Sequence, residues 1–442
     1  MTDMTKELKF EIKTLGCKVN QYEEQAIREK LLRLGFSEAG GSEADIFIVN
    51  SCSVTARADA KTKQAIRRAR KENPSAKIFV TGCYAVMEED IEKLKSMPEV
   101  HGVVPGGEKM TLPEVLGFAF LGRTTPEADT PEQVSWFSSH TRAFLKVQDG
   151  CDRKCSYCKV NIVRGPSTSR DEKEILAEVE RLVAGGYREI VLTGICLGSW
   201  KGENGRSLVD LIRAVDALSG DFRIRVSSIE PDQIHGDLVN AIAGSVKVCR
   251  HLHIPMQSGS DRILKVMNRR YASGDLIRTV AMIREKMPLA GITMDIIAGF
   301  PGEEEEDFQK TVSVVKEIKP SRLHVFRYSD RKGTVSYGLP GKISKSEAQE
   351  RVKTLISLGE DLQKDFCGKF IGAEVEVLLE KFNGDSPGDE ICPNGMEGYS
   401  GEYLRTRVCD DDASSGGILM VKITAVDENA PVLISNARRI KP

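Results

Sequence analysis

The sequence predicts an α/β protein of three successive domains: an α/β domain with a parallel sheet, a partial barrel of six strand–helix units, and a small all-β barrel. Three observations support this prediction. The chain has 442 residues, and one domain typically needs about 100 to 200. Short β-rich runs alternate with amphipathic helical patterns over most of the chain, which is typical of parallel sheets. The helical patterns stop near residue 367, so we place the domains at residues 1–130, 136–366 and 367–442.

The first domain is predicted from three strand-like runs with a helix between the first two. The runs cover residues 8–15, 45–50 and 77–81. Residues 21–34 place apolar side chains at helical spacing, and Gly35 follows, a residue type that commonly ends helices. Strands joined through helices pair in parallel, so this is a βαβαβ unit. The polar segment 122–132, with two prolines, is predicted to be a linker.

The middle domain contains six strand-like runs. They begin near Phe144, Glu189, Arg223, His251, Ile292 and Arg322. Helical segments such as residues 173–184 and 274–286 lie between them, and the acidic run 303–307 is predicted to be the solvated first turn of another helix. Six strand–helix units are two fewer than a closed eight-stranded barrel needs. We therefore expect an open partial barrel with the active site at the carboxyl ends of its strands.

The last domain shows only short alternating runs, at residues 374–379, 403–408 and 419–425, separated by Gly, Asp, Asn and Ser. Such a pattern predicts strands joined by turns. The small size of the segment favours a compact all-β barrel.

Composition excludes several classes of protein. The formal net charge is -2 and the pI is about 6.4, so any contact with nucleic acid must come from local basic patches. No apolar run approaches the roughly eighteen residues of a membrane span, and the N-terminus does not resemble a secretory signal. We therefore expect a cytoplasmic protein. Eleven cysteines in such a chain favour ligation or catalysis over disulfides.

The first group of cysteines is Cys151, Cys155 and Cys158, spaced C-x3-C-x2-C after the first strand of the middle domain. Three thiolates on a short loop can hold three irons of a [4Fe-4S] cluster and leave the fourth iron open for chemistry. A zinc site would need a fourth ligand nearby, and no histidine occurs between His140 and His235. Three unrelated loop thiols are the other alternative, but the spacing favours the cluster.

The second group is Cys17, Cys52 and Cys83, each just past one predicted strand of the first domain. The carboxyl ends of parallel strands meet at one edge of a sheet, so these thiols can converge on a single ligand. The alternative is ordinary packing, because free cysteine is often buried. A cysteine after each of three strands favours a second cluster.

These two groups, followed by a small β-module, resemble the radical S-adenosylmethionine methylthiotransferases over nearly the whole chain. The motifs TLGCKVNQYE (residues 14–23), NSCSVTARAD (50–59) and HLHIPMQSGSDRILKVMNRRY (251–271) resemble the subgroup that acts on N6-threonylcarbamoyladenosine at tRNA position 37. Enzymes of the isopentenyladenosine and ribosomal-protein types carry different residues after the first cysteine. The resemblance implies a radical S-adenosylmethionine barrel, a TRAM-like C-terminal domain, two [4Fe-4S] clusters and S-adenosyl-L-methionine as radical source and methyl donor.

The resemblance also implies roles for the two groups of cysteines. The cluster on Cys151, Cys155 and Cys158 would generate the radical that takes hydrogen from C2 of the adenine. The cluster on the N-terminal cysteines would present a sulfur that a second S-adenosylmethionine has methylated. The implied cofactor-binding residues are Tyr157, Gly194, Ser228, Glu230, Gln257 and Gly299.

The chain departs from the family pattern at two positions. Asn161 stands where the family usually has proline, and Cys196 occupies a strand-end position that is more often polar. Neither departure removes a cluster ligand. We predict an inert thiol at Cys196, because reactivity needs an accessible, electropositive setting. The remaining cysteines are predicted to be structural: Cys249, Cys367, Cys392 and Cys409.

The expected function is methylthiolation of C2 of N6-threonylcarbamoyladenosine in tRNA. The alternatives are the same chemistry on isopentenyladenosine or on a ribosomal-protein aspartate, and a non-catalytic RNA-binding iron–sulfur protein. The expected partners are the tRNA anticodon loop, an electron donor such as flavodoxin or ferredoxin, and a sulfur source. We expect a monomer without a membrane partner.

Two places are predicted to contact RNA. The helical segment 57–71 is strongly basic, and its Arg67, Arg68 and Lys71 are candidates for phosphate contacts, the alternative being a solvated helix face. In the TRAM-like domain, Arg405 is the candidate, with Tyr403 expected on the same strand face by the period of two and Arg407 next along it.

Overall fold

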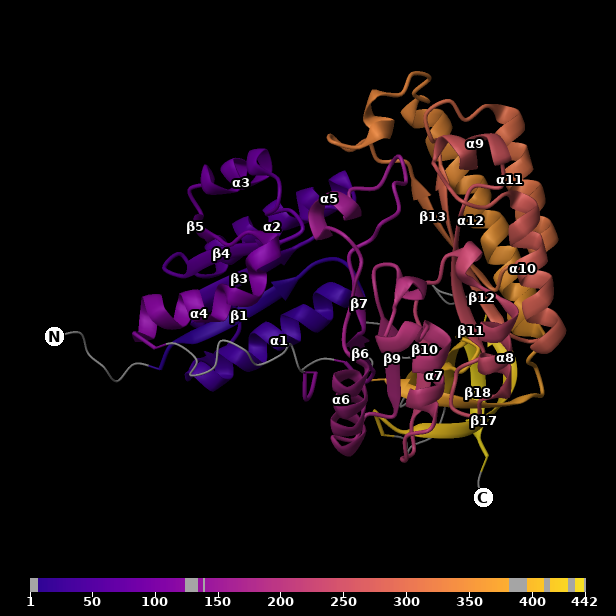
Figure 1. The fold of residues 1–442 in the computed structure, drawn as a ribbon, viewed down its shortest axis with the longest axis horizontal. Coiled ribbons are helices and arrows are strands. Elements are labelled where there is room, and N and C mark those ends of the chain that lie inside the picture. The colour runs from indigo at the N-terminus through magenta and orange to yellow at the C-terminus, as the bar shows by residue number, and fades with distance from the viewer. Residues whose placement is uncertain are drawn as a thin grey trace. The chain divides into compact units, whose positions relative to one another are not determined.

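The structure is a computed structural model that describes residues 7–123, 134–137, 140–380, 396–408, 414–427 and 434–440. The chain divides into two compact units, each assembled from separate segments (Figure 1). One contains Met1–Ser138, Asp149–Thr168 and Ser329–Tyr337. The other contains Ser139–Gln148, Ser169–Tyr328 and Gly338–Pro442. The C-x3-C-x2-C loop therefore belongs to the same unit as the N-terminal cysteines. The predicted linker lies almost wholly outside the described residues.

The first unit contains a five-stranded parallel sheet in the order β2-β1-β3-β4-β5. Its strands are β1 (Lys9–Thr14), β2 (Ser37–Glu38), β3 (Ile46–Ser51), β4 (Lys77–Gly82) and β5 (Val100–Val103). The central strand β3 is buried along its whole length. The three predicted strands are confirmed, and the two strands that sequence patterns missed are the short ones at the sheet edges.

Helices surround this sheet. They are α1 (Lys18–Leu34), α2 (Ala56–Glu72), α3 (Glu88–Lys95), α4 (Leu112–Leu116) and α5 (Val160–Arg164). On α1 the helical spacing of Ile27, Leu31 and Leu34 produces one buried face that packs against Phe10 and Ile48 of the sheet. The helix ends at Gly35, whose φ of 97° is accessible to glycine at little cost.

The second unit contains the predicted six-stranded partial barrel. Its strands are β6 (Ala143–Lys146), β9 (Glu189–Thr193), β10 (Arg223–Val226), β11 (His251–Gln257), β12 (Gly291–Ala298) and β13 (Arg322–Arg327). They form two parallel sheets, β10-β9-β6 and β11-β12-β13, and a parallel bridge between Ser228 and His253 links the two sheets. Two two-residue strands, β7 (Gln148–Asp149) and β8 (Thr168–Ser169), flank the cysteine loop. The predicted open (βα)6 architecture is confirmed.

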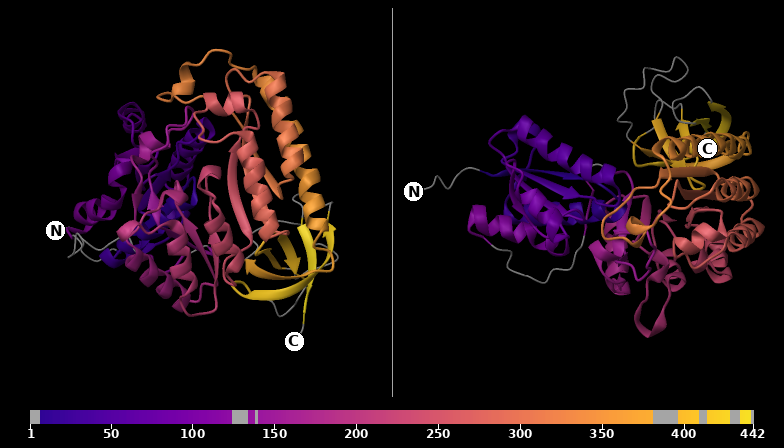
Figure 2. Two further views of the ribbon diagram at one scale, coloured as in Figure 1. Left: turned by 45° about the vertical axis from the view of Figure 1, so that its right-hand side comes forward. Right: turned by 90° about the horizontal axis from the view of Figure 1, so that it is seen from above.

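The helices of this unit follow the strands in turn. They are α6 (Glu172–Ala184), α7 (Leu208–Asp216), α8 (Gly236–Gly244), α9 (Asp261–Val266), α10 (Ser273–Lys286), α11 (Glu305–Ile318) and α12 (Lys345–Gly368). The long helix α12 packs along β13 and leads into the C-terminal barrel (Figure 2). Among the described residues, no helix is both long and apolar enough to span a membrane.

The C-terminal segment forms a closed barrel in the strand order β14-β15-β16-β18-β17. Its strands are β14 (Glu374–Glu380), β15 (Met396–Ser400), β16 (Arg405–Val408), β17 (Ile418–Asp427) and β18 (Ile434–Arg439). The predicted all-β barrel is confirmed. The expectation that Tyr403 shares a strand face with Arg405 is wrong, because β16 begins at Arg405 and Tyr403 lies in the preceding turn with a φ of 71°. Cys392 and Cys409 lie outside the described residues.

A buried charge cluster fixes this barrel to the amino ends of β9 and β10. Glu189 accepts hydrogen bonds from Arg223 at 2.6 Å and Arg225 at 2.7 Å. Arg223 also donates to the carbonyl oxygen of Tyr399 at 2.7 Å, and Arg225 donates to that of Ser400 at 2.9 Å. Burial alone would raise the pKa of Glu189, but these guanidinium groups hold it well below its usual value. The cluster therefore remains charged and joins the partial barrel to the C-terminal barrel.

Candidate active site

The three N-terminal cysteines lie at one edge of the first sheet. Cys17 follows β1 and precedes α1, Cys52 follows β3, and Cys83 follows β4. These strands are neighbours, so their carboxyl ends meet. A Cβ atom added at Gly16, whose φ is 111°, would lie 2.9 Å from the Cβ of Cys52, so only glycine fits there. Cys83 and Cys17 both add to the rise in the pKa of Cys52, and Cys83 adds to the rise in the pKa of Cys17. The structure thus brings the predicted group together.

The chemistry of these thiols fits an iron–sulfur cluster. Burial raises the pKa of Cys52 to about 11. The residue Cys17 is exposed as a whole, but the protein atoms around its thiol still raise its pKa, and the guanidinium of Arg164 opposes this rise. Backbone N–H groups of Asn20 and Val54 donate to the sulfurs of Cys17 and Cys52. Iron would displace the thiol protons, and these donors would then stabilise the bound thiolates.

The C-x3-C-x2-C loop presents three partly exposed thiols. It starts at Gly150, where a Cβ atom would lie 1.8 Å from the carbonyl oxygen of Pro166. The N–H of Arg153 donates to the sulfur of Cys151, and that of Val160 donates to the sulfur of Cys158, each at 3.4 Å. Within the described ranges, no group of three His, Cys, Asp or Glu side chains is placed to hold one metal ion. An iron–sulfur cluster does not need such a group, because each thiolate binds a different iron of the cluster and the three ligands do not meet at one ion.

One buried arginine connects the surroundings of the two cysteine groups. Arg164 ends α5, just after the loop, and its guanidinium contacts Glu23 at 3.0 Å, Asp149 at 2.9 Å and the side chain of Asn20. Asn20 and Glu23 are on α1, the helix that begins after Cys17. Burial alone would lower the pKa of Arg164, but the surrounding negative charge raises it well above the usual value. Sequence patterns missed this residue, and its position six residues after Cys158 is the signal that could have indicated it.

The segment Ser329–Tyr337 also belongs to this unit and contacts residues beside both cysteine groups. Arg331 forms an ion pair with Asp59 at 2.7 Å and donates to the hydroxyl of Ser53, next to Cys52, at 2.9 Å. The N–H of Ser336 donates to the carbonyl oxygen of Ser156, inside the loop, at 2.8 Å. This segment therefore helps to fix the loop in place.

The predicted cofactor-binding residues divide between the two units. Tyr157 is half-buried in the cysteine loop. The others lie at carboxyl ends of barrel strands: Gly194 after β9, Ser228 and Glu230 after β10, Gln257 at the end of β11, and Gly299 after β12. Glu230 is ion-paired with Arg269, and Gln257 has a φ of 62°, a strained conformation for a residue other than glycine. Their binding role stays a prediction.

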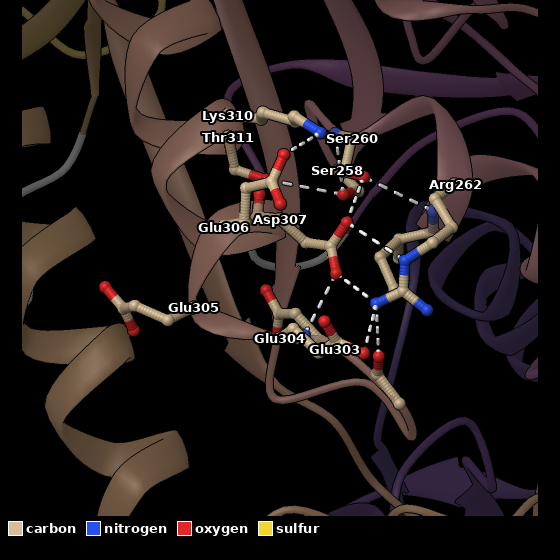
Figure 3. A network of polar contacts seen from close by, with 12 residues as sticks. Ser258, Ser260, Arg262, Glu303, Glu304, Glu305, Glu306, Asp307, Lys310 and Thr311 are labelled. Carbon is tan, nitrogen blue, oxygen red and sulfur yellow. Dashed lines mark hydrogen bonds and ion pairs between the residues drawn. The ribbon is translucent and has the colours of Figure 1, made fainter.

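The loop after Gln257 is held by a polar network around Asp307 (Figure 3). The carboxylate of Asp307 accepts hydrogen bonds from the hydroxyl of Ser260 at 2.6 Å and from Arg262. Burial alone would raise the pKa of Asp307, but these bonds lower it to about 2. The expectation of a solvated acidic turn is thus wrong for part of the run 303–307, because Glu303 and Asp307 are buried and paired.

Replacing Asp307 by alanine is expected to lower the free energy of unfolding by about 2 kcal/mol, because buried donors lose a charged acceptor while Arg262 is partly screened by water. Urea unfolding of the two proteins measures the difference. Glu306→Ala is the matched control, since Glu306 forms an exposed ion pair with Lys310, and it should change stability by less than about 0.5 kcal/mol. Equal losses in both variants would contradict this role of Asp307.

Comparisons with known proteins agree with this arrangement. Residues 9–105 match the model of uncharacterized protein family UPF0004, and residues 145–315 match that of the radical SAM superfamily. The threonylcarbamoyladenosine tRNA methylthiotransferase MtaB of Chlamydia pneumoniae is 41% identical over 378 residues, covering 85% of this chain and 87% of that protein. The MtaB protein of Thermotoga maritima is 37% identical, covering 89% and 90%. A tRNA-2-methylthio-N(6)-dimethylallyladenosine synthase from Jannaschia sp. is 34% identical, covering 97% and 93%.

Among solved structures, the radical S-adenosylmethionine methyltransferase TsrM from Kitasatospora setae, with cobalamin and a [4Fe-4S] cluster bound, has a similar fold. Its TM-score is 0.53 at 14% identity, and the likeness covers 86% of this chain and 82% of that one. The partial barrel, the C-x3-C-x2-C motif and the superfamily match together define a radical S-adenosylmethionine enzyme. The chain belongs to the radical S-adenosylmethionine methylthiotransferase family, in the subgroup that contains the MtaB proteins. The predicted family and class of chemistry are confirmed.

Proposed function

We propose that the protein methylthiolates C2 of N6-threonylcarbamoyladenosine at position 37 of tRNA. The observation that supports this most is the pair of cysteine groups within one unit, in a chain that is 41% and 37% identical to two threonylcarbamoyladenosine tRNA methylthiotransferases along nearly their whole lengths. An aromatic C–H bond has no acid–base route at neutral pH, so cofactor chemistry is needed. The two sets of three cysteines can each hold one cluster, so one cluster can serve as the radical source and the other as the sulfur carrier.

The cysteines would hold the two clusters. Cys151, Cys155 and Cys158 would hold one [4Fe-4S] cluster, and Cys17, Cys52 and Cys83 the other. When bound, the clusters and S-adenosylmethionine supply the radical, the sulfur and the methyl group. The chain itself fixes the two groups of ligands through Arg164 and Arg331 and donates backbone hydrogen bonds to the sulfurs.

We further propose that the six cofactor-binding residues hold S-adenosylmethionine. The conformations of Gly299 and Gln257 support this, because both have positive φ angles at carboxyl ends of strands, where parallel sheets bind ligands. The remaining proposed contacts are Tyr157, Gly194, Ser228 and Glu230.

The basic helix α2 is the proposed RNA contact of the first domain, residues 1–130. Arg67, Arg68 and Lys71 are exposed, and Arg68 shares its charge with Glu72 in a surface ion pair at 2.6 Å. In the C-terminal domain, residues 367–442, Arg405 is bound to Glu397 at 2.6 Å, so an RNA phosphate there would compete with that carboxylate.

The middle domain, residues 136–366, would receive electrons from a flavodoxin or ferredoxin, because cleavage of S-adenosylmethionine is reductive. A separate sulfur source would replace the atom transferred in each turnover. We propose a monomer located in the cytoplasm, where its tRNA substrate is found.

Nucleoside mass spectrometry of bulk tRNA tests the proposal. Cells without the gene should lack methylthio-threonylcarbamoyladenosine, and the wild-type gene should restore it while a Cys155→Ala gene should not. Loss of methylthio-isopentenyladenosine instead would keep the chemistry and change the substrate. No change in either nucleoside would favour a ribosomal-protein substrate or a non-catalytic RNA-binding role.

A further inference from the structure

The sheet β11-β12-β13 has one face that the helices do not cover. On β12, Ile292, Met294 and Ile296 are fully buried. Met294 is in register with Leu323, which packs against Gly359 of α12, so this buried face is the helix side. Side chains alternate along a strand, and Asp295 and Ile297 therefore point to the opposite side.

A group of polar side chains lies on this second face. His253 bonds to Asp295 at 3.1 Å through Nε2 and to the hydroxyl of Thr293 at 2.8 Å through Nδ1. The ring of His324 lies 5.7 Å from that of His253, and His324 is in register with Asp295. The side chains of His253 and Asp295 remain 17% and 28% exposed. These side chains form an accessible polar cluster on the inner face of the partial barrel.

The next position toward the carboxyl ends of the strands is apolar. Ile297 is in register with Phe326, which shares the face of His324 and is 47% exposed. β12 ends at Ala298, and Gly299 follows it with a φ of 77°. The amino end of the face is closed, because the ring of His251 stacks on Tyr403 of the C-terminal segment with centroids 4.5 Å apart. From the closed end to the strand ends, the face is thus first polar and then aromatic.

We infer that this face binds the modified base: Phe326 and Ile297 contact the purine ring, and His253, Asp295 and His324 recognise a polar, ionised substituent on N6. This inference rests on the proposed function. A threonylcarbamoyl group offers N–H and hydroxyl donors to Asp295 and a carboxylate to the histidines. A dimethylallyl group offers no hydrogen bond or charge to these side chains, so its binding would remove water from them without replacing the lost interactions, and the site would reject it.

The inference is tested by binding and turnover on one pair of RNAs. The probes are anticodon stem-loops with threonylcarbamoyladenosine or unmodified adenosine at position 37, and the protein is the full chain with reconstituted clusters. The wild type should bind the modified RNA more tightly. Asp295→Asn should weaken binding of the modified RNA about 10- to 100-fold and leave the unmodified RNA unchanged. Glu317→Gln, an exposed change on α11, is the matched control and should alter neither.

A second variant gives a different expected pattern. Phe326→Leu removes an exposed ring without disturbing the core, and it should weaken both RNAs by about tenfold and keep their ratio. An unchanged preference for the modified RNA in Asp295→Asn, or an equal affinity of the wild type for both RNAs, would overturn the inference. Methylthiolation of the modified RNA by the wild type, measured in parallel, reports on the proposed function separately.

Discussion

Cys155→Ala is expected to abolish both the cleavage of S-adenosylmethionine and the formation of methylthiolated tRNA, whereas Cys52→Ala should retain cleavage and lose the product. The reason is that Cys155 and Cys52 would bind different clusters. Cys155 belongs to the loop that would hold the radical-generating cluster, and Cys52 belongs to the group at the edge of the first sheet. Anaerobic assays of 5'-deoxyadenosine and of modified nucleoside, on the same reconstituted samples, measure the two activities.

Cys196→Ala is the control for this pair of variants. Its thiol is buried and contacts Ser199 at 3.1 Å, so the change should leave both cleavage and product intact. Iron analysis should find one cluster in each of the two ligand variants and two in the control. Wild-type product levels from Cys52→Ala would remove the role given to the second cluster, and full cleavage by Cys155→Ala would remove that of the first.

Replacing Glu189 by alanine should lower the free energy of unfolding by about 3 to 5 kcal/mol, because two buried guanidinium groups would lose their shared counter-charge. Arg223 and Arg225 also bind carbonyl groups of the C-terminal barrel. The same change should therefore loosen that barrel. Urea unfolding measures the stability loss, and limited proteolysis should show faster cleavage within residues 367–442.

Glu180→Ala on α6 provides the comparison, since Glu180 is exposed and its loss should cost less than about 0.5 kcal/mol. Glu189→Gln keeps the shape and part of the hydrogen bonding, so its effect should fall between the two. A loss below 1 kcal/mol for Glu189→Ala would show that water reaches the arginines and screens them.

Much of the fold could be predicted because it follows from local patterns. Buried strands that alternate with amphipathic helices indicated the parallel sheets, and the positions of Cys17, Cys52 and Cys83 after three such strands predicted one shared edge. The short edge strands β2 and β5 escaped, since they bury few side chains.

What the sequence could not show depends on distant contacts. Arg164 and Glu23 are 141 positions apart, and no periodic pattern relates them. The same is true of Arg223 and Tyr399 of the C-terminal barrel, which are 176 positions apart. Asp307 looked solvated because its neighbours are acidic, and only the fold places Arg262 and Ser260 around it.

The interleaved first unit has a consequence for synthesis of the protein on the ribosome. Its sheet is complete by residue 103, but the unit also includes Asp149–Thr168 and Ser329–Tyr337. At translation rates of about 5 to 20 residues per second, the last segment emerges roughly 10 to 40 s after residue 138. During that interval Ser53 and Asp59, which follow Cys52 in the chain, lack their contacts with Arg331. A fragment truncated after residue 138 would keep this incomplete state permanently, so the N-terminal cysteines should be studied in the intact polypeptide.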